Sequence, residues 1–267
     1  MFRENDTNGG RNLNSLAILI LTKNEEANIA AVIENARQCS DEVVIVDSGS
    51  TDRTVELAKA AGARVVYRAW DNDFAAQRNF ALQQTRSDWV LYLDADERLT
   101  ASLQVSVKEA VAKNENKQYS IQRKSSAFGK RFNYGVLYPD WVPRLFPRDS
   151  VVWVGQVHEH PECELPLQKL SGFMEHYTYR SWQQWETKMS RYTTIWARDA
   201  YKRGRRTSLA GIFFHGIGGF LKMCFVKRGI LDGWMGFYLC CLHFFYTTLK
   251  YLKLYERQEQ KRKSGLT

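Results

Sequence analysis

The sequence predicts an α/β protein with a mainly parallel sheet, a mixed β region after it, and a C-terminal helical segment. Three observations support this prediction. Up to about residue 100, short apolar runs alternate with stretches of helical periodicity. Between about residues 118 and 157, short runs rich in Tyr, Phe, Trp and Val are broken by glycine and proline. From residue 209 onward, glycine and aromatic residues dominate the composition.

Four runs in the first part of the chain are expected to be strands, and the first two are expected to be buried, as is typical of parallel sheets. These runs are Leu16–Thr22, Glu42–Asp47, Arg64–Tyr67 and Trp89–Leu93. The expected helices are Glu25–Arg37, a helix capped by Asp52 that ends near Ala61, Phe74–Gln84 and, after the mixed β region, Ser181–Lys202. Strands that alternate with such helices indicate right-handed crossovers and a mainly parallel sheet.

The composition narrows the possible partners and the compartment. The 267 residues have a formal net charge of +9, which favours contact with an anionic membrane surface, a phosphorylated ligand or nucleic acid. No known nucleic-acid motif is present, so nucleic acid is not an expected partner. Five cysteines without a C-x-x-C pair argue against a disulfide framework and favour a reducing cytosol. The polar residues 1–14 are expected to be a flexible leader and lack the apolar stretch of a signal peptide.

Polar residues end three of the expected strands, where ligands bind in an open parallel sheet. They are Thr22, Asp47 and the pair Asp94 and Asp96. A single Asp after a strand is usually a turn former or a helix cap, but three strand ends converge on this edge. Two carboxylates spaced by two residues are suited to a hard cation such as Mg²⁺ or Mn²⁺, whose remaining ligands are water and substrate phosphates. The pattern therefore predicts a site for a metal and a phosphorylated ligand.

The same segments resemble family 2 glycosyltransferases. The runs LAILILTKNEE, EVVIVDSGSTDRT, QRNFAL and WVLYLDADERL occur in the family's order over roughly residues 15–100. The resemblance implies a GT-A, Rossmann-like fold and a metal-dependent hexosyltransferase that inverts the anomeric centre. Farther on, PRLFPR at Pro143–Arg148 and VGQVHEH at Val154–His160 resemble the subgroup of lipopolysaccharide inner-core β-1,4-glucosyltransferases. Some peptide glycosyltransferases are similar to this pattern too.

The resemblance implies a role for each residue of the matching motifs. Thr22 and Asp47 would line the nucleoside pocket, and Arg78 would contact the base or the diphosphate. Asp94 would bind the ribose, and Asp96 would bind the metal. Without the family, Arg78 could equally be a solvated helix arginine.

The general base is expected to be Glu159, with His158 beside the leaving group or the acceptor. Many relatives place the base in a Glu-Asp pair after the mixed β region, and this chain has Val-His-Glu there instead. The alternatives are a surface role for Glu159, a backbone contact for His158, and a base at Asp140 or Glu162. His176 is a candidate third metal ligand, although a histidine in an aromatic setting is more often structural. Arg144 and Arg148 could pair with an anionic acceptor or be ordinary loop arginines.

The C-terminal segment is expected to attach to a membrane without a defined orientation. Gly233–Leu249 has no formal charge, and at about 1.5 Å per residue it is somewhat short of the roughly 30 Å hydrocarbon core. Basic residues flank it on both sides, which favours an interfacial, monotopic helix at the cytoplasmic face of the inner membrane. The alternative is a helix pair buried against the enzyme or a partner chain.

The expected organisation and function follow from these observations together. The ranges are a leader (1–14), a catalytic domain (15–180) with a nucleotide-binding half (15–100) and an acceptor half (101–180), a helix (181–208), membrane-associating helices (209–256) and a basic tail (257–267). The expected reaction transfers glucose from a UDP-sugar to a membrane-anchored glycolipid, the lipopolysaccharide inner core. Alternatives are transfer to polyprenyl phosphate or to a peptide, and a nucleotide-sugar-binding protein without activity. Loss of Asp96 would have favoured the last of these, and Asp96 is present.

Overall fold

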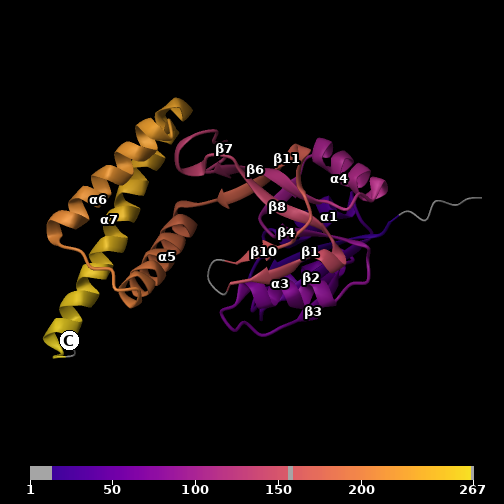
Figure 1. Cartoon of the computed structure of the whole chain (residues 1–267), viewed down its shortest axis with the longest axis horizontal. Coiled ribbons are helices and arrows are strands. Elements are labelled where there is room, and N and C mark those ends of the chain that lie inside the picture. Colours follow the sequence, from indigo (N-terminus) through magenta and orange to yellow (C-terminus); the bar gives the residue numbers. More distant parts are fainter. Residues whose placement is uncertain (1–13, 156–158, 266–267) are drawn as a thin grey trace, which may run out of the picture. The chain divides into compact units, whose positions relative to one another are not determined.

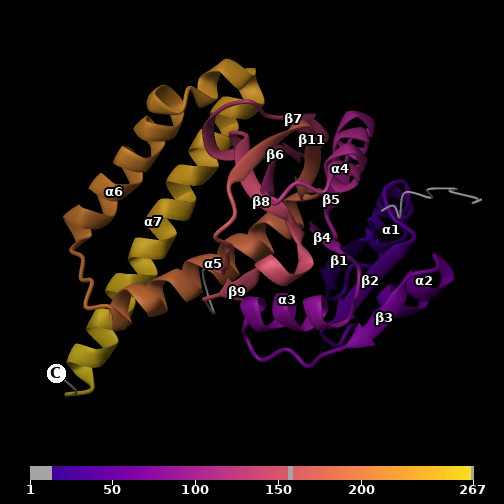
Figure 2. The same cartoon turned by 45° about the vertical axis from the view of Figure 1, so that its right-hand side comes forward.

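The computed structural model describes residues 14–155 and 159–265, and the chain divides into two compact units. The sheet unit comprises the chain up to Gln122 together with Trp141–Met174. The helical unit comprises Arg123–Asp140 and the chain from Glu175 onward. Each unit is considered by itself below, and Figures 1 and 2 show the elements of both.

The sheet unit contains the predicted parallel sheet. Strands β1 (Leu16–Thr22), β2 (Glu42–Asp47), β3 (Arg64–Tyr67) and β4 (Trp89–Asp94) are parallel in the order β3-β2-β1-β4. Strand β8 (Asp140–Pro147) then pairs antiparallel with β4. The sheet continues through β6 (Gln118–Ala127), β11 (Leu167–Tyr179) and β5 (Glu97–Leu99), and β9 (Val152–Val154) pairs separately with β10 (His160–Glu162). The fold is therefore α/β, with a mixed region after the parallel strands.

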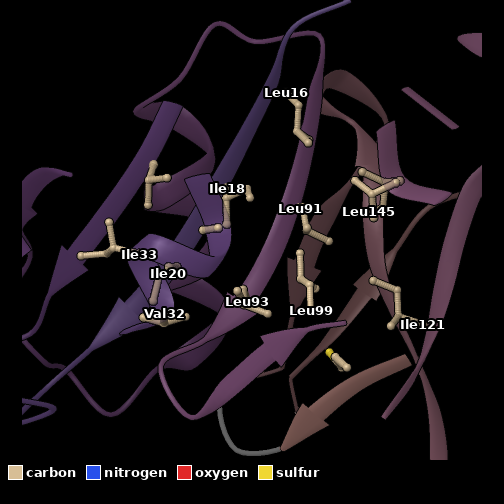
Figure 3. Packing of buried hydrophobic residues seen from close by; sticks show 14 of the residues in the cluster. Leu16, Ile18, Ile20, Val32, Ile33, Leu91, Leu93, Leu99, Ile121 and Leu145 are labelled. Atoms are coloured by element: carbon tan, nitrogen blue, oxygen red, sulfur yellow. The ribbon is translucent and has the colours of Figure 1, made fainter. Parts of the chain in front are cut away.

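Helices cover both faces of the parallel strands. On one face, Ile18, Ile20 and Leu91 pack with residues of α1 (Ile29–Arg37), α2 (Thr54–Ala60) and α4 (Ala101–Lys113), and Figure 3 shows part of this cluster. On the other face, Leu19, Val44 and Tyr92 pack with residues of α3 (Phe74–Gln83) and with Trp153 of β9. Burial on both faces is the reason that β1, β2 and β4 have nearly continuous apolar sequences, whereas β3 is exposed at both ends.

Two predicted helix starts differ from the structure for local reasons. The helix expected from Glu25 begins at Ile29, because the carbonyl of Glu25 accepts the amide of Asn28 at 2.8 Å in a tight turn. The helix expected to be capped by Asp52 begins at Thr54 with Arg53 at the N-cap position, and Oδ1 of Asp52 accepts the Thr54 amide at 3.0 Å. The helix α3 ends at Gln83, one residue before the predicted end.

The helical unit is built from three long helices. They are α5 (Trp182–Lys202), α6 (Leu209–Leu221) and α7 (Gly233–Lys263). A π-helical turn (Lys222–Val226) continues α6, and a 3₁₀ turn (Gly229–Asp232) leads into α7. The unit also contains the short strand β7 (Lys130–Arg131), which pairs with β6, and a 3₁₀ turn at Gly135–Leu137.

The segment predicted to attach to the membrane is partly a core element of this unit. Gly233–Leu249 forms the first half of α7, and its residues Leu239 and Leu242 pack on Phe132 and Leu137. Close packing against α6 depends on glycine, because a Cβ on Gly216 would lie 2.5 Å from the Thr248 hydroxyl. The buried-helix alternative therefore describes this face of α7, and the expected basic tail is the continuation of the same helix as far as Lys263.

Candidate functional site

The strand register places three of the predicted residues at one edge of the parallel sheet. Thr22 pairs with Asp47, and Leu21 pairs with Asp94. The Thr22 hydroxyl is buried and has no hydrogen-bond partner within the described chain. An unsatisfied buried hydroxyl costs about 1–3 kcal/mol, so a polar ligand group at this position would recover free energy.

The Asp47 carboxylate shapes the turn that follows β2. It accepts the backbone amides of Gly49 at 2.9 Å and of Ser50 at 3.0 Å, and it also accepts the Ser50 hydroxyl. Gly49 has a φ of +89°, a conformation that favours glycine. Much of the acceptor capacity of Asp47 is thus used locally, as expected for a turn former, although the residue is at the predicted edge.

The turn between β4 and β5 is formed by Ala95 and Asp96, between Asp94 and Glu97, and its geometry depends on a buried carboxylate. The Glu97 side chain is fully buried and accepts the backbone amide of Asp94 at 2.9 Å. The Arg144 guanidinium from β8 then donates to Asp94 at 2.7 Å and to Glu97 at 2.9 Å. Glu97 was not among the predicted site residues, because its buried partner lies 47 positions away in sequence. The alternation of buried Ala95, Glu97 and Leu99 is the one sequence signal for its burial.

A second buried arginine completes the cluster. Arg78 of α3 donates from Nη2 to Asp94 at 3.1 Å, and its side chain is only 6% exposed. Burial alone would raise the pKa of Asp94, but the guanidiniums of Arg144 and Arg78 outweigh that effect and hold the pKa well below its ordinary value. Asp94 is therefore a carboxylate at every physiological pH, and 33% of its side chain remains accessible.

Arg78 also has unused hydrogen-bonding capacity. Its Nε and Nη1 atoms are buried and lack hydrogen-bond partners among the described residues. The guanidinium lies 4.6 Å from the ring centroid of Trp153 and 5.8 Å from that of Tyr92, so aromatic faces hold it in place. A fixed guanidinium with two free donors is suited to an anionic or carbonyl oxygen of a ligand. This agrees better with the predicted binding role than with a solvated helix arginine.

Glu159 belongs to the same cluster. Its Oε1 lies 3.8 Å from Nη2 of Arg78, and its side chain is 23% exposed. Arg78 thus lies between the Asp94 carboxylate and the predicted base. Of the alternatives, Asp140 is held by Arg123 at 2.8 and 3.0 Å, and Glu162 is exposed on β10. His158 lies outside the described residues.

The remaining predicted residues are distributed differently. Asp96 is half-buried in the turn after β4, and His176 is on β11 in the helical unit, where Nδ1 lies 3.2 Å from the hydroxyls of Ser125 and Thr178. No three His, Cys, Asp or Glu side chains within residues 14–155 and 159–265 are grouped as a metal cage. A cation held by one or two carboxylates and completed by phosphates and water does not need such a cage, so an accessible Asp96 fits Mg²⁺ or Mn²⁺.

The two arginines of the PRLFPR motif are at opposite ends of the neighbouring strand β4. Arg144 lies beside the carboxylates at the C-terminal end of β4. The backbone amide of Arg148 instead donates to the carbonyl of Asp88, the residue before the start of β4. Arg148 pairs with its exposed neighbour Asp149 at 2.8 Å. Only Arg144 therefore belongs to the cluster, and there it binds the protein's own carboxylates.

Comparisons with known proteins place this geometry in context. Residues 17–160 match the profile described as "Glycosyl transferase family 2". An uncharacterized glycosyltransferase of Rickettsia typhi is 30% identical over 91% of this chain and 88% of its own length. The lipopolysaccharide core biosynthesis glycosyltransferase LpsC of Rhizobium meliloti is 29% identical over 92% of this chain and 94% of its own length. A glucosyl-3-phosphoglycerate synthase of Mycobacterium tuberculosis, solved with Mn²⁺, UDP and its product, has a TM-score of 0.45 at 20% identity over 73% of this chain and 82% of that one.

Proposed function

This chain belongs to glycosyl transferase family 2, and from that premise we propose that it transfers glucose from UDP-glucose to a membrane-anchored glycan with inversion at the anomeric carbon. The observation that supports a catalytic role most directly is the cluster of Arg78, Asp94, Arg144, Glu97 and Glu159 beside the ends of the parallel strands. A protein that only bound nucleotide sugars would not need an accessible carboxylate such as Glu159 in that position.

Donor binding would use polar groups at and beside the ends of the parallel strands. The Thr22 hydroxyl and Asp47 would line the nucleoside pocket, and Asp94 would accept a ribose hydroxyl. The free Nε and Nη1 donors of Arg78 would bind oxygens of the base or the diphosphate. Arg144 and Glu97 would act as positioning residues, because they fix the turn that presents Asp94 and Asp96.

Asp96 would hold a Mg²⁺ or Mn²⁺ ion, and we do not include His176 in this site because it belongs to the helical unit. When bound, the cation supplies the positive charge that neutralises the departing diphosphate. The protein's own contribution is the rigid turn on which Asp96 is placed, since Glu97 and Arg144 hold that turn from the buried side.

Glu159 would be the general base of a single displacement. The acceptor hydroxyl oxygen attacks the anomeric carbon, the bond from that carbon to the diphosphate oxygen breaks, and the electron pair leaves with UDP. The proton of the acceptor hydroxyl passes to the Glu159 carboxylate. A carboxylate can accept this proton when it lies within hydrogen-bond reach of the hydroxyl. His158 would lie beside the leaving group or the acceptor.

The acceptor class is proposed from the similarity to LpsC, which extends over nearly the whole of both chains. The proposed acceptor is the lipopolysaccharide inner core, and the proposed location is the cytoplasmic face of the inner membrane. An acceptor that is itself fixed in a membrane requires the enzyme to approach the lipid surface. The helical unit has a surface suited to this approach.

That surface consists of α6 and the turns that follow it. Leu209–Val226 is the one helical stretch within the described chain that is long and apolar enough to cross a membrane, and only 17% of its residues are buried. Phe213, Phe214, Phe225 and Trp234 are exposed on α6, the following turns and the start of α7. Lys222, Lys227 and Arg228 are exposed among them, as expected for side chains at lipid phosphates. We propose that this surface, and not the buried half of α7, lies in the membrane interface.

A donor screen tests the proposed reaction. The purified protein in detergent is incubated with Mn²⁺ and a panel of nucleotide sugars, and thermal stability and slow donor hydrolysis are measured. UDP-glucose is expected to raise the melting temperature and to be hydrolysed only with the metal. If no nucleotide sugar stabilises the protein, the proposed function is wrong.

A further inference from the structure

The side chain of Asn79 holds the backbone of a neighbouring strand. Its Nδ2 donates to the Trp153 carbonyl at 2.8 Å, and its Oδ1 accepts the Trp153 amide at 2.9 Å. Asn79 is on α3, directly after Arg78, and Trp153 is the central residue of β9. The two hydrogen bonds therefore form a reciprocal clamp between β9 and the helix that contains Arg78. Of the three residues of the QRN motif, the proposed donor site uses only the arginine.

The pairing of β9 with β10 leaves the backbone of Trp153 available for this clamp. Trp153 lies opposite Pro161 in the antiparallel ladder, and proline has no amide hydrogen to exchange with a partner strand. The amide and the carbonyl of Trp153 instead both bond to Asn79. A two-stranded sheet is marginally stable at best by itself, so the place of this ladder depends on its contacts with the rest of the sheet unit. Asn79 thus satisfies the backbone groups that a third strand would otherwise satisfy.

The same ladder places the proposed general base. Glu159 directly precedes β10, and His160, the first residue of β10, pairs with Val154 of β9. The Glu159 carboxylate lies 3.8 Å from Nη2 of Arg78. Because Arg78 and Asn79 are adjacent on α3, the ion pair and the clamp connect the helix to the ladder at neighbouring points. The position of the Glu159 carboxylate relative to α3 therefore depends on the clamp.

We propose that Asn79 is a positioning residue for Glu159, and this proposal rests on the proposed glycosyl transfer. By holding β9 on α3, Asn79 keeps the carboxylate within reach of the acceptor hydroxyl. A general base acts only within hydrogen-bond reach, and a displacement of about 1 Å can lower a rate by about 100-fold. Donor binding depends less on the clamp, because the Trp153 ring beside Arg78 is also packed on Tyr92, with 5.0 Å between the ring centroids.

A double-mutant cycle tests whether Asn79 acts through Glu159. Transfer from UDP-glucose to a lipopolysaccharide inner-core acceptor is measured in single turnovers with Mn²⁺, for the full chain in detergent. Asn79→Ala is expected to lower the transfer rate at least about tenfold, while UDP affinity, measured by calorimetry, changes by less than about threefold. In the Glu159→Gln background the same change should lower the remaining rate by less than about twofold, since no base is left to position.

Asn35→Ala is the matched control, because Asn35 makes the same kind of clamp elsewhere in the sheet unit. Its Nδ2 donates to the Leu99 carbonyl at 2.9 Å, and its Oδ1 accepts the Leu99 amide at 2.7 Å. Asn35 and Asn79 are both half-buried, so the two changes remove equivalent contacts. The effect of Asn35→Ala on transfer should be the same in the wild-type and the Glu159→Gln backgrounds, as expected for a clamp that does not act through the base.

Two results overturn the proposal. One is an equal effect of Asn79→Ala in both backgrounds, because a purely structural clamp lowers both rates alike, and the other is a normal transfer rate in Asn79→Ala. If thermal unfolding shows that Asn79→Ala does not fold, Asn79→Asp, which keeps an acceptor for the Trp153 amide, enters the cycle under the same criteria. A wild-type protein that transfers no sugar instead contradicts the proposed function itself, and the role of Asn79 falls with it.

Discussion

The sheet unit and the helical unit use charged and apolar side chains in opposite ways. In the sheet unit, Arg78 and Arg144 are buried and paired with carboxylates at the end of β4. In the helical unit, lysines and arginines near the end of α6 are exposed beside exposed aromatic side chains. Buried ion pairs hold a geometry at a cost in desolvation, whereas exposed cations next to apolar side chains suit a surface that meets lipid. This difference agrees with the proposal that the sheet unit carries out the transfer and that the helical unit attaches to a membrane.

The largest effect is expected from breaking the buried pairs of the sheet unit. Arg144→Met removes the guanidinium that pairs with the buried carboxylate of Glu97, and removal of one partner from a buried pair costs about 3–5 kcal/mol of stability. Urea denaturation should show this loss of unfolding free energy, and sugar transfer should be lost with it. The matched control is Arg148→Gln, since Arg148 is half-exposed and pairs with the exposed Asp149, so its loss should change stability by less than about 0.5 kcal/mol. Equal effects of the two changes would mean that the cluster does not organise the turn.

Asp96→Ala is expected to abolish turnover while the fold is kept. Asp96 is half-buried on the turn and is not one of the carboxylates that pair with Arg144, so its loss should not disturb the packing of the sheet unit. A fall of at least about 100-fold in kcat, equivalent to about 2.7 kcal/mol, is expected from the loss of the metal ligand. Calorimetric titration of Mn²⁺ and UDP should show the matching loss of affinity. Activity that still depends on the metal in this variant would refute the assignment of Asp96.

Glu159→Gln separates binding from chemistry within the same cluster. Glutamine keeps the shape of the side chain but cannot accept the acceptor proton, so transfer should fall by roughly 10²–10⁴-fold. Donor affinity should change little, because Glu159 approaches Arg78 only at 3.8 Å. Single-turnover kinetics with UDP-glucose measure the chemical step directly. Near-normal transfer would move the base to another carboxylate, and Asp140→Asn and Glu162→Gln would be the next variants to measure.

Substitutions on the exposed surface of α6 are expected to have the smallest effect on activity in solution and the largest effect on membrane binding. Phe214→Ser together with Phe225→Ser removes two exposed aromatic side chains, each worth about 1.5–3 kcal/mol when fully buried in an apolar medium. Sedimentation with vesicles that contain anionic lipid should show at least a tenfold loss of binding. Val105→Ser, at an exposed apolar residue of α4 in the sheet unit, is the control and should bind vesicles normally. If wild-type protein stays in the supernatant, the proposed attachment is wrong.

Removal of the whole C-terminal segment is a poorer test of attachment than these substitutions. From the sequence alone, a chain that ends near Thr207 is expected to lose membrane association and to keep UDP binding, because every proposed donor and metal residue precedes Ser181. In the structure, however, Leu239 and Leu242 of α7 pack on Ala127, Phe132 and Leu137. Truncation would expose this core, so loss of membrane binding could not be separated from unfolding of the helical unit.

The sequence by itself determined the parallel strands and most of the helix positions. The bounds of β1, β2 and β3 match the predicted runs. For β1 and β2 the reason is that a strand buried on both faces needs a continuous apolar sequence that few other structures share. The convergence of Thr22, Asp47 and Asp94 followed from the same pattern, since parallel strands end at one edge. The four motifs in order were also sufficient to identify the family.

Only the tertiary structure decided which side chains complete the cluster and which apolar faces are buried. Glu97 and Arg144 are 47 positions apart in the sequence, and Arg78 contacts Asp94 from α3, the helix that precedes β4. No local sequence pattern predicts these contacts. The two apolar stretches of the C-terminal segment look alike in composition, yet the residues of α6 are largely exposed while Leu239 and Leu242 of α7 are buried. The periodicity of the sequence shows that one face of a helix is apolar. Which element packs on that face, if any, depends on contacts between residues that are distant in sequence.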